Sequence, residues 1–331
     1  MITTSSLLAP VDDDLHILTE NLKQLVGARH PILRAAAEHL FDAGGKRIRP
    51  AIVLLVARAI SHHENSGRNT TGDITARHRR LAEITEMIHT ASLVHDDVVD
   101  EADLRRNVPT VNSLFSNKVA VLAGDFLFAQ SSWYLANLDN LEVVKLLSEV
   151  IRDFAEGEIL QSISSFDTDV SLEAYLEKSY YKTASLVANS AKAAGVLSDV
   201  SEEVANNFYD YGRNFGLAFQ IVDDILDFNA STEVLGKPAG ADLASGNLTA
   251  PVIYAMEEKP YLKVLIEREF CEDGDLEEAI AIVNNGNGIT RARELALIHT
   301  EKAQNSLLGL SVSDSAKSLR KLTDYNLSRL Y

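Results

Sequence analysis

The chain has 331 residues, of which 46% are hydrophobic, 24% are charged and one is a cysteine. This length and apolar content allow a large buried core, so the composition excludes a disordered or fibrous protein. The formal net charge of −17 argues against a general affinity for nucleic acid or anionic lipid surfaces. A single cysteine excludes an intramolecular disulfide. Because no apolar run reaches the roughly 18 residues of a membrane span, we expect a soluble protein.

Apolar residues recur at helical spacing along almost the whole chain, whereas alternating strand patterns are scarce. The predicted helices cover residues 12–26, 30–42, 47–61, 78–101, 112–137, 141–166, 171–194, 201–228, 249–257, 260–270, 275–284, 288–307 and 313–329. None of the polar or Gly-rich breaks between them is typical of a linker between independent domains. We therefore expect one all-α domain of antiparallel helices over residues 1–331, with residues 1–10 as a flexible terminus.

The first unusual segment is HDDVVDEAD at 95–103, which places five carboxylates at the end of a predicted helix. Asp96 and Asp100 project from one helix face with Asp97 beside them, and like charges at this spacing repel. A divalent cation would remove that cost, and oxygen-only ligands favour Mg²⁺ over zinc. His89 lies two turns earlier on the same face, where a buried core histidine is an equally good interpretation.

Basic residues flank this motif in the sequence. The segment GGKRIRP at 44–50 places three of them after a Gly pair, at an expected helix start that favours an anion. Arg105 and Arg106 follow the acidic motif, and arginine binds phosphate oxygens in a bidentate manner. Either group alone would be read as surface salt bridges. Together they predict two anion sites, one bridged by metal and one built from basic side chains alone. By contrast, RHRR at 77–80 is typical of a solvated helix start.

The second half of the chain repeats the acidic pattern in QIVDDILDF at 220–228. One face of this predicted helix carries Gln220, Asp223, Asp224 and Asp227. A solvated acidic face is the plain alternative for either motif, but two copies on apolar helices with basic partners favour a function.

Two further segments carry basic residues in the second half. KSYYKTASL at 178–186 places Lys178 and Lys182 on one helix face, followed by Thr183. Lys237 lies in a Gly-rich loop that could close over a bound anion. Both segments support the prediction of a phosphate-binding site.

These segments, in this order, resemble the trans-type polyprenyl diphosphate synthases over nearly the whole chain. The motifs DDVVD and DDILD, together with LRR, KTASL and FQIVDD, make the resemblance specific. The surrounding sequence, including EMIHTASLVHDDVVDE, is most similar to the solanesyl diphosphate synthases of cyanobacteria and plastids. The resemblance implies helices packed around a deep central cavity, a homodimer, and a location in the cytoplasm or the plastid stroma.

The resemblance also implies a role for each motif residue, with isopentenyl diphosphate and an allylic diphosphate primer as substrates. The implied ligands of Mg²⁺, roughly three ions per active site, are Asp96, Asp97, Asp100, Asp223, Asp224 and Asp227. The implied contacts of the primer's diphosphate are Arg105, Lys182, Thr183, Gln220 and Lys237. The implied contacts of isopentenyl diphosphate are Lys46, Arg49, His89 and Arg106. The residues with the most direct implied part in catalysis are Asp96, Asp97, Asp100, Arg105, Lys182, Asp223 and Asp224.

Small residues behind the first motif favour a long product. Ser92 lies one turn before Asp96 on the same face, with Ala91 next to it. Aromatic residues there would block a growing chain, whereas Ala and Ser leave a passage for it. Ile88 is one candidate for the end of that passage. We therefore expect a long-chain product such as solanesyl diphosphate, for quinone side-chain synthesis.

Two positions depart from the family pattern, and three other functions remain open. Asn107 stands where a Gly is usual, and Asn tolerates left-handed backbone geometry. Asn247 stands where a second Lys often follows the second motif. The alternatives are a shorter-chain synthase, a class I terpene cyclase, and a non-catalytic partner subunit. Transient membrane contact for release of the apolar product is a further hypothesis.

Overall fold

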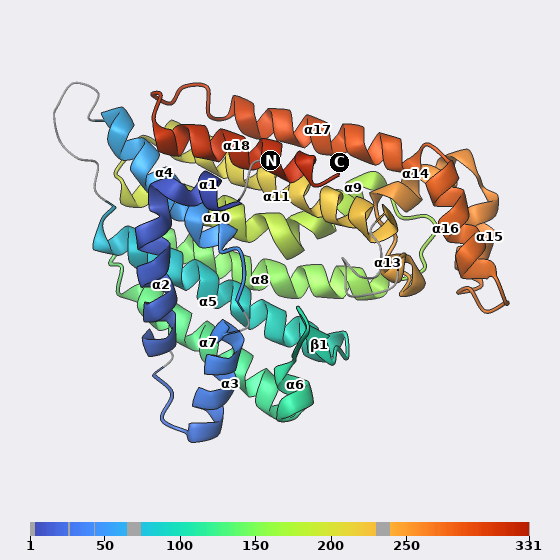
Figure 1. The fold of residues 1–331 in the computed structure, drawn as a ribbon, viewed down its shortest axis with the longest axis horizontal. Coiled ribbons are helices and arrows are strands. Elements are labelled where there is room, and N and C mark those ends of the chain that lie inside the picture. The colour runs from blue at the N-terminus through green and yellow to red at the C-terminus, as the bar shows by residue number, and fades with distance from the viewer. Residues whose placement is uncertain (1–3, 26, 43, 65–73, 230–238, 331) are drawn as a thin grey trace. The chain divides into compact units, whose positions relative to one another are not determined.

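The computed structural model describes residues 4–25, 27–42, 44–64, 74–229 and 239–330. These residues are overwhelmingly helical, which confirms the predicted all-α class (Figure 1). In the first half the elements are α1 (Thr4–Leu8), a 3₁₀ turn (Ala9–Val11), α2 (Asp12–Leu25), α3 (Pro31–Asp42), α4 (Ile48–Glu64), α5 (Ala76–Val99), β1 (Leu104–Arg105), β2 (Val108–Pro109), α6 (Val111–Leu114), α7 (Asn117–Ala136) and α8 (Leu141–Ile163).

In the second half the helices also follow the predicted ranges closely. They are α9 (Leu172–Ser179), α10 (Ser185–Leu197), α11 (Glu202–Asn229), α13 (Ala241–Ala244), α14 (Ala250–Glu258), α15 (Tyr261–Glu267), α16 (Asp275–Asn285), α17 (Gly288–Asn305) and α18 (Asp314–Ser328). Between α9 and α10 the chain forms one π-helical segment, Tyr180–Ala184, where a continuous helix was predicted. None of the helices in the described ranges is both long enough and apolar enough to cross a membrane.

Contacts divide the chain into two compact units, each made of segments that are distant in sequence. Unit 1 comprises Met1–Ile151, Leu186–Tyr209 and Leu307–Leu322, and unit 2 comprises Arg152–Ser185, Asp210–Ser306 and Thr323–Tyr331. The first acidic motif belongs to unit 1 and the second to unit 2. The prediction of a single domain over residues 1–331, with a central cavity, stays a prediction.

In unit 1, α5 packs against α4, α2 and α7, and Figure 1 shows α5 beside α7. Helix α5 starts at a capping box, because the Thr75 side chain accepts from the His78 amide and the His78 side chain accepts in return. Most of its interior residues are buried, including Glu83 and Glu86, and the first acidic motif begins in its last turn. In unit 2, α14 packs on α17, α15, α16 and α9 around an apolar cluster that includes Ile221 and Ile225 of α11.

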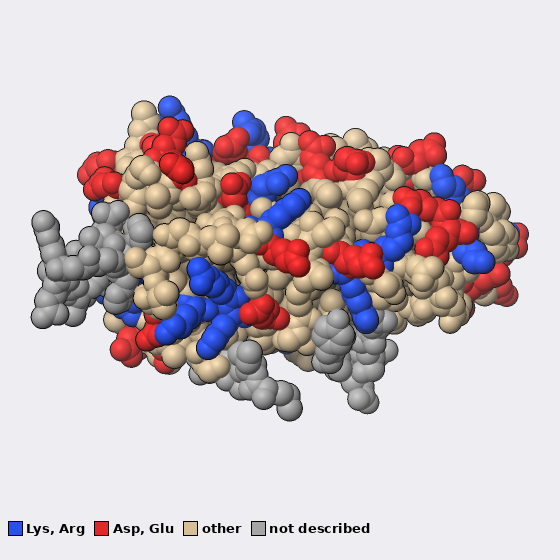
Figure 2. Space-filling view, turned by 90° about the horizontal axis from the view of Figure 1, so that it is seen from above, with Lys and Arg blue, Asp and Glu red and all other residues tan. Residues whose placement is uncertain are grey.

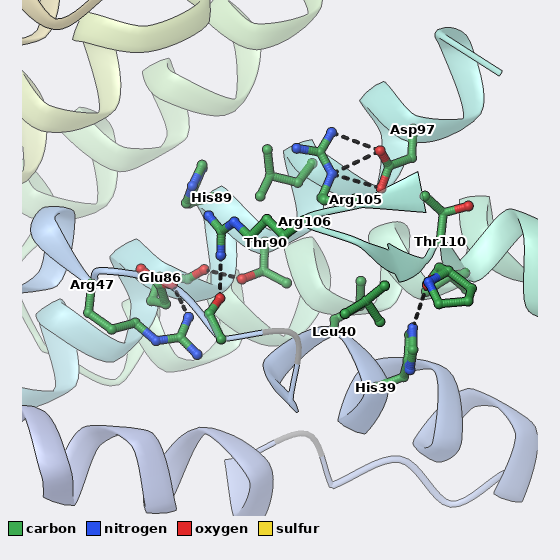
Figure 3. Close-up of a pocket in the computed structure, with 15 residues that line it drawn as sticks. His39, Leu40, Arg47, Glu86, His89, Thr90, Asp97, Arg105, Arg106 and Thr110 are labelled. Carbon is green, nitrogen blue, oxygen red and sulfur yellow. Dashed lines mark hydrogen bonds and ion pairs between the residues drawn. The ribbon is translucent and has the colours of Figure 1, made fainter. Parts of the chain in front are cut away.

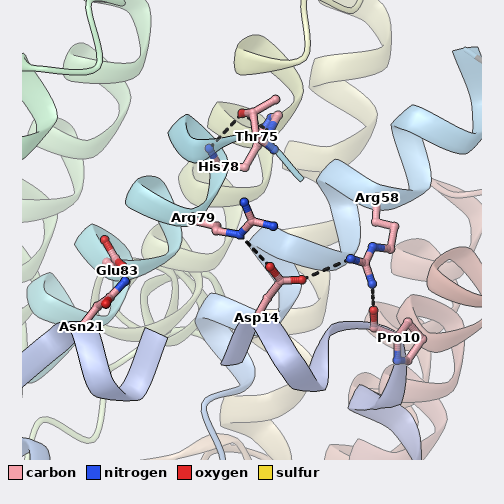
Figure 4. A network of polar contacts seen from close by, with 8 residues as sticks. All are labelled: Pro10, Asp14, Asn21, Arg58, Thr75, His78, Arg79 and Glu83. Atoms are coloured by element: carbon pink, nitrogen blue, oxygen red, sulfur yellow. Dashed lines mark hydrogen bonds and ion pairs between the residues drawn. The ribbon is translucent and has the colours of Figure 1, made fainter. Parts of the chain in front are cut away.

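Residues 4–10, the part of the expected flexible terminus that the structure describes, form α1 and the start of the 3₁₀ turn. Leu7 and Leu8 are buried, because α1 and the following turn pack their apolar side chains into unit 1. Asp14 of α2 then anchors this region. It accepts hydrogen bonds from Arg58 of α4 at 3.1 Å and from Arg79 of α5 at 2.7 Å (Figure 4).

The segment 77–80 is accordingly not a solvated helix start. His78 is buried and contacts the Ala194 carbonyl at 3.2 Å, and Arg77 donates to the Leu138 carbonyl at 2.6 Å. The interpretation of RHRR as solvated was wrong because a run of basic residues does not reveal that its partners lie in distant helices. Elsewhere on the surface, basic and acidic side chains are interspersed, as on the face in Figure 2.

Candidate active site

In unit 1 a pocket opens where the last turns of α5 meet the start of α4 and the β1–β2 hairpin (Figure 3). Its polar lining includes Arg47, His89, Asp97, Arg105 and Arg106. These side chains come from separate segments that the sequence singled out for anion and metal binding. The structure therefore gathers at one pocket the basic and acidic groups that were predicted from different motifs.

The hairpin positions the two arginines. Leu104 pairs with Pro109 and Arg105 with Val108, which leaves a two-residue turn at Arg106 and Asn107. Both turn residues have left-handed backbone, with φ of 54° and 64°, as the tightest hairpin turns require. The sequence expectation that Asn107 can hold this turn without a glycine is confirmed. Because the strands are so short, the arginine at the end of β1 lies directly beside the end of α5.

Asp97 is the buried member of the first motif, with only 3% of its surface exposed. Arg105 covers it: Nε lies 2.8 Å from one carboxylate oxygen and 2.9 Å from the other, and a terminal nitrogen lies 2.8 Å away. A buried carboxylate is tolerated when a guanidinium neutralises it in this manner. Asp96 is partly exposed and Asp100 is exposed at the end of the helix. The guanidinium of Arg105 therefore neutralises the innermost carboxylate.

His89 belongs to the basic side of the pocket. Arg49 donates to its Nε2 at 3.0 Å, so the ring proton is assigned to Nδ1. Burial holds the pKa of His89 well below its usual value, and the charges of Arg49, Arg106 and Arg105 lower this pKa further. The imidazole is thus neutral at physiological pH. His89 lines the pocket, and its role in an anion site stays a prediction.

Glu86, one turn before His89, was missed by the sequence reasoning. It is 5% exposed and pairs with Arg47. A carboxylate in an apolar helix interior was the available signal, but its partner is 39 positions away in sequence. Arg106 donates to the carbonyl of Gly44, and Lys46 is exposed in the same loop. Of the four implied contacts for isopentenyl diphosphate, His89 and Arg106 line the pocket, Arg49 contacts His89, and Lys46 lies in the adjoining loop.

In unit 2 the second motif is held by side chains from α9, from α11 itself and from the turn that follows α18. Asp224 is 2% exposed and accepts hydrogen bonds from the Tyr175 hydroxyl at 2.5 Å and the Gln220 amide at 2.7 Å. Burial, and then the charge of Asp242, raises the pKa of Asp224 to about 7. Asp223 accepts from Arg329 at 2.6 Å. The contacts of Tyr175 and Arg329 with the motif were not predicted, since neither residue belongs to a recognisable sequence motif.

The lysine–threonine segment joins the same network. Thr183 donates to the Gln220 side chain at 2.7 Å, so Gln220 links Thr183 to Asp224. Lys182 donates to Glu158 at 2.7 Å and to Gln161 at 2.8 Å. Both residues lie on the π-helical segment, a feature that often marks functional sites. Asp227 accepts from the Asp242 backbone amide at 3.2 Å. Lys237 lies outside the described residues.

The donor chemistry of both motifs fits Mg²⁺, since all candidate ligands are carboxylate oxygens. Within the described ranges, however, no three acidic, His or Cys side chains converge into a ready-made metal site. The two results are compatible, because Mg²⁺ takes only one or two carboxylates and completes its shell with water and substrate phosphates. Asp97 and Asp223 would have to exchange their arginine partners for the metal.

The three chain-length candidates differ in their surroundings. Ile88 and Ala91 are fully buried in unit 1, whereas Ser92 is partly exposed and donates to the His89 carbonyl at 2.9 Å. Of the three, only Ser92 is therefore partly accessible to solvent.

Comparison with known proteins agrees with these motifs. A model of the polyprenyl synthetase family matches residues 30–283. The chain belongs to the polyprenyl synthetase family. It is 71% identical to a prenyl transferase of Synechocystis sp. over the full length of both proteins. It is 56% identical to the chloroplastic solanesyl diphosphate synthase 2 of Arabidopsis thaliana, over 99% of this chain and 78% of that one.

Solved structures of polyprenyl synthetase relatives have the same fold. A decaprenyl diphosphate synthase from Rhodobacter capsulatus superposes with a TM-score of 0.89 at 33% identity, over 99% of this chain and 100% of that one. A polyprenyl synthase from Caulobacter crescentus, complexed with calcium and isoprenyl diphosphate, gives a TM-score of 0.88 at 32% identity, over 99% of this chain and 98% of that one. The predicted family, fold and prenyltransferase class are confirmed.

Proposed function

We propose that this member of the family elongates an allylic diphosphate by successive trans condensations with isopentenyl diphosphate, and that its product is solanesyl diphosphate for quinone synthesis. The observation that carries the proposal is the pocket in which Arg106 and the Arg49–His89 pair adjoin Asp97 and Arg105. It places basic side chains that can bind an anion next to an acidic side chain that can bind a metal ion, as the coupling of two diphosphates requires. The solanesyl product is supported by relatives that bear that name.

In this proposal the chain's own residues bind and orient two anions. Arg105, Lys182, Thr183 and Gln220 hold the primer's diphosphate, and Lys46, Arg49, His89 and Arg106 hold that of isopentenyl diphosphate. Neutral His89 donates through Nδ1 and adds no charge, so Arg49 and Arg106 provide the charge. Mg²⁺ held by the two acidic motifs would neutralise charge on the departing diphosphate. Roughly three ions, as family resemblance implies, would share the six carboxylates.

The reaction breaks the bond between the primer's allylic carbon and its diphosphate. The double bond of isopentenyl diphosphate supplies the electron pair for the new carbon–carbon bond, and a proton then leaves the adjacent carbon. The released diphosphate would accept that proton. Basic side chains that are fixed before the bond breaks lower the barrier because they need no reorganisation.

The experiment that tests the proposal is a product analysis. Purified protein is incubated with Mg²⁺, geranylgeranyl diphosphate and labelled isopentenyl diphosphate, and the dephosphorylated alcohols are resolved by chromatography and mass spectrometry. A dominant solanesol peak is expected. A shorter dominant alcohol would support the shorter-chain alternative, and no elongation from any allylic primer would support the non-catalytic subunit.

A homodimer is part of the proposal, and α7 offers a surface for it. Leu122, Ala129 and Trp133 are exposed along one face of this helix, with 51% and 61% exposure for Leu122 and Trp133. An apolar stripe of this kind is typical of an interface. Sedimentation equilibrium should give a dimer, and Trp133→Glu should shift it towards monomer.

Location and membrane contact are also proposals. We propose that the protein acts in the cytoplasm or the plastid stroma and touches membranes only transiently during product release. Co-sedimentation with neutral liposomes should increase after turnover, and unchanged sedimentation would contradict the membrane contact.

A further inference from the structure

Helix α9 brings a second lysine to the second acidic motif. The Lys178 ammonium donates to the Asn247 side-chain oxygen at 2.6 Å, and the lysine is only 8% exposed. Tyr175, one turn earlier on the same helix face, donates to Asp224. One face of α9 thus presents a hydroxyl group and an ammonium group to the motif. The mechanism proposed above uses neither.

Neutral and charged groups both surround Lys178. Its partner Asn247 is neutral, so that hydrogen bond fixes the ammonium without cancelling its charge. Burial is the largest influence on the pKa of Lys178 and lowers it, whereas the nearby carboxylates of Asp224 and Asp242 raise this pKa. A buried ammonium is costly unless opposite charges stand close by. The carboxylates of Asp224 and Asp242 therefore stabilise the ammonium of Lys178, whereas the charge of Lys182 opposes it.

We propose that Lys178, held in place by Asn247, is a built-in counter-cation of the second acidic motif that strengthens binding of the primer's diphosphate. The inference deepens the proposed function and rests on it. The fixed cation attracts a diphosphate and repels metal ions, so the motif binds metal weakly alone and tightly together with the anion. The family resemblance implies a second Lys where Asn247 stands, and in this proposal α9 supplies the positive charge at that position instead.

The first test is the charge-removing substitution Lys178→Met, measured without turnover. By isothermal titration calorimetry, free Mg²⁺ should bind the variant roughly threefold to tenfold more tightly, because a repelling charge is gone. Inorganic diphosphate in saturating Mg²⁺ should bind roughly tenfold more weakly. A loss of structure would weaken both, so the opposite directions separate an electrostatic role from a structural one.

The second test exchanges the two partners of this hydrogen bond, so that the positive charge stands at position 247. Lys178→Asn combined with Asn247→Lys should return both affinities to within about threefold of the wild-type values, and Lys178→Arg should retain them. Lys263→Met is the matched control, because Lys263 pairs with exposed Asp169 at 3.5 Å on α15 and should change neither affinity.

Two results would overturn the inference: parallel weakening of both affinities in Lys178→Met, or no change in either. Failure of the proposed function would look different. If the wild-type protein elongates no primer, the proposed synthase activity is refuted. If Lys178→Met still changes the two affinities in opposite directions, the counter-cation role stands.

Discussion

Arg105 and Asp97 neutralise each other across the entrance of the pocket, with Nε of the arginine 2.8 and 2.9 Å from the two carboxylate oxygens. In the proposed complex the same two residues have separate partners, a diphosphate for the arginine and a metal for the carboxylate. Ligand binding must therefore exchange one internal ion pair for two external ones. In the ligand-free protein, the pair keeps a buried carboxylate from standing uncompensated.

The first prediction removes one half of this pair. Arg105→Gln leaves Asp97 buried with no guanidinium, and should lower the free energy of unfolding by about 2 kcal/mol without metal. Added Mg²⁺ should restore part of this loss, as measured by urea denaturation. The kcat/KM for the primer should fall at least roughly 100-fold. The double variant Arg105→Gln, Asp97→Asn should recover stability but not activity. Equal instability of the single and double variants would contradict the explanation.

The second prediction concerns the hydroxyl group that holds the second motif. Tyr175→Phe removes one of two donors to buried Asp224 and should cost about 1–2 kcal/mol in the free energy of unfolding. Because the carboxylate is then free to rotate, the Mg²⁺ concentration for half-maximal activity should rise several-fold.

Tyr254→Phe is the control for this substitution. It deletes a hydroxyl group in the same unit but retains the ring on which Arg291 packs at 4.0 Å, so both quantities should stay near wild type. Indistinguishable behaviour of the two variants would mean that the hydrogen bond to Asp224 contributes nothing.

The third prediction tests how the π-helical segment is held. A Cβ on Gly216 of α11 would lie 2.5 Å from the Ala184 Cα, which is backbone that cannot rotate away. Gly216→Ala should therefore separate α11 from the segment that carries Lys182 and Thr183. We expect a loss of about 2–3 kcal/mol in stability and a higher KM for the primer. Gly309→Ala, where a Cβ meets nothing within 4 Å, should change neither quantity; a stable, fully active Gly216→Ala would refute the account.

Helix positions were predictable from sequence because an apolar period of 3.6 is a local property. The pattern over 78–101 gave α5 to within two residues at each end. The π-helical segment at 180–184 was not predictable, because it lies where Gly216, a residue distant in sequence, lets α11 approach Ala184 closely. The buried N-terminal turn was missed for the same reason: the residues that cover Leu7 come from elsewhere in the chain.

The residues of the candidate site also divide into those that the sequence predicts and those that it does not. Asp97, Asp224 and the basic segments were found because their spacing is itself a signal. Their partners in the ligand-free protein were not. Arg329 reaches Asp223 from 106 positions away and Lys178 reaches Asn247 from 69 positions away. Such pairs are created by tertiary packing: Arg329 belongs to no motif, and the lysine pattern that includes Lys178 does not reveal that its partner is Asn247.

The fourth prediction is a pH dependence of stability. His299 is buried and its Nδ1 lies 2.9 Å from the Asn214 side-chain oxygen. Burial, with the charges of Lys302 and Arg213, lowers the pKa of His299 to about 4, whereas the unfolded value is about 6.5. Between these values the unfolded chain binds the extra proton, so the free energy of unfolding decreases as pH falls from about 6.5 to 4.

The measurement is the pH dependence of urea denaturation for the wild type and His299→Gln. The wild type should lose about 2 kcal/mol more than the variant between pH 7 and pH 4.5. Parallel profiles of the two proteins would show that His299 does not titrate as expected.

The last prediction separates two neighbouring residues that the sequence treated alike. Ser92 is partly exposed on the face that carries Asp96, so Ser92→Phe should extend a ring from that face and shorten the dominant product at near-normal stability. Ala91 is fully buried, so Ala91→Phe should overpack unit 1 and cost about 3 kcal/mol in the free energy of unfolding. Product alcohols from each variant are compared by mass spectrometry beside their melting temperatures. A stable Ala91→Phe with shortened product would place the passage on the Ala91 side of α5. An unchanged product from Ser92→Phe would remove Ser92 from the passage, since a phenylalanine on that face could not leave room for the growing chain.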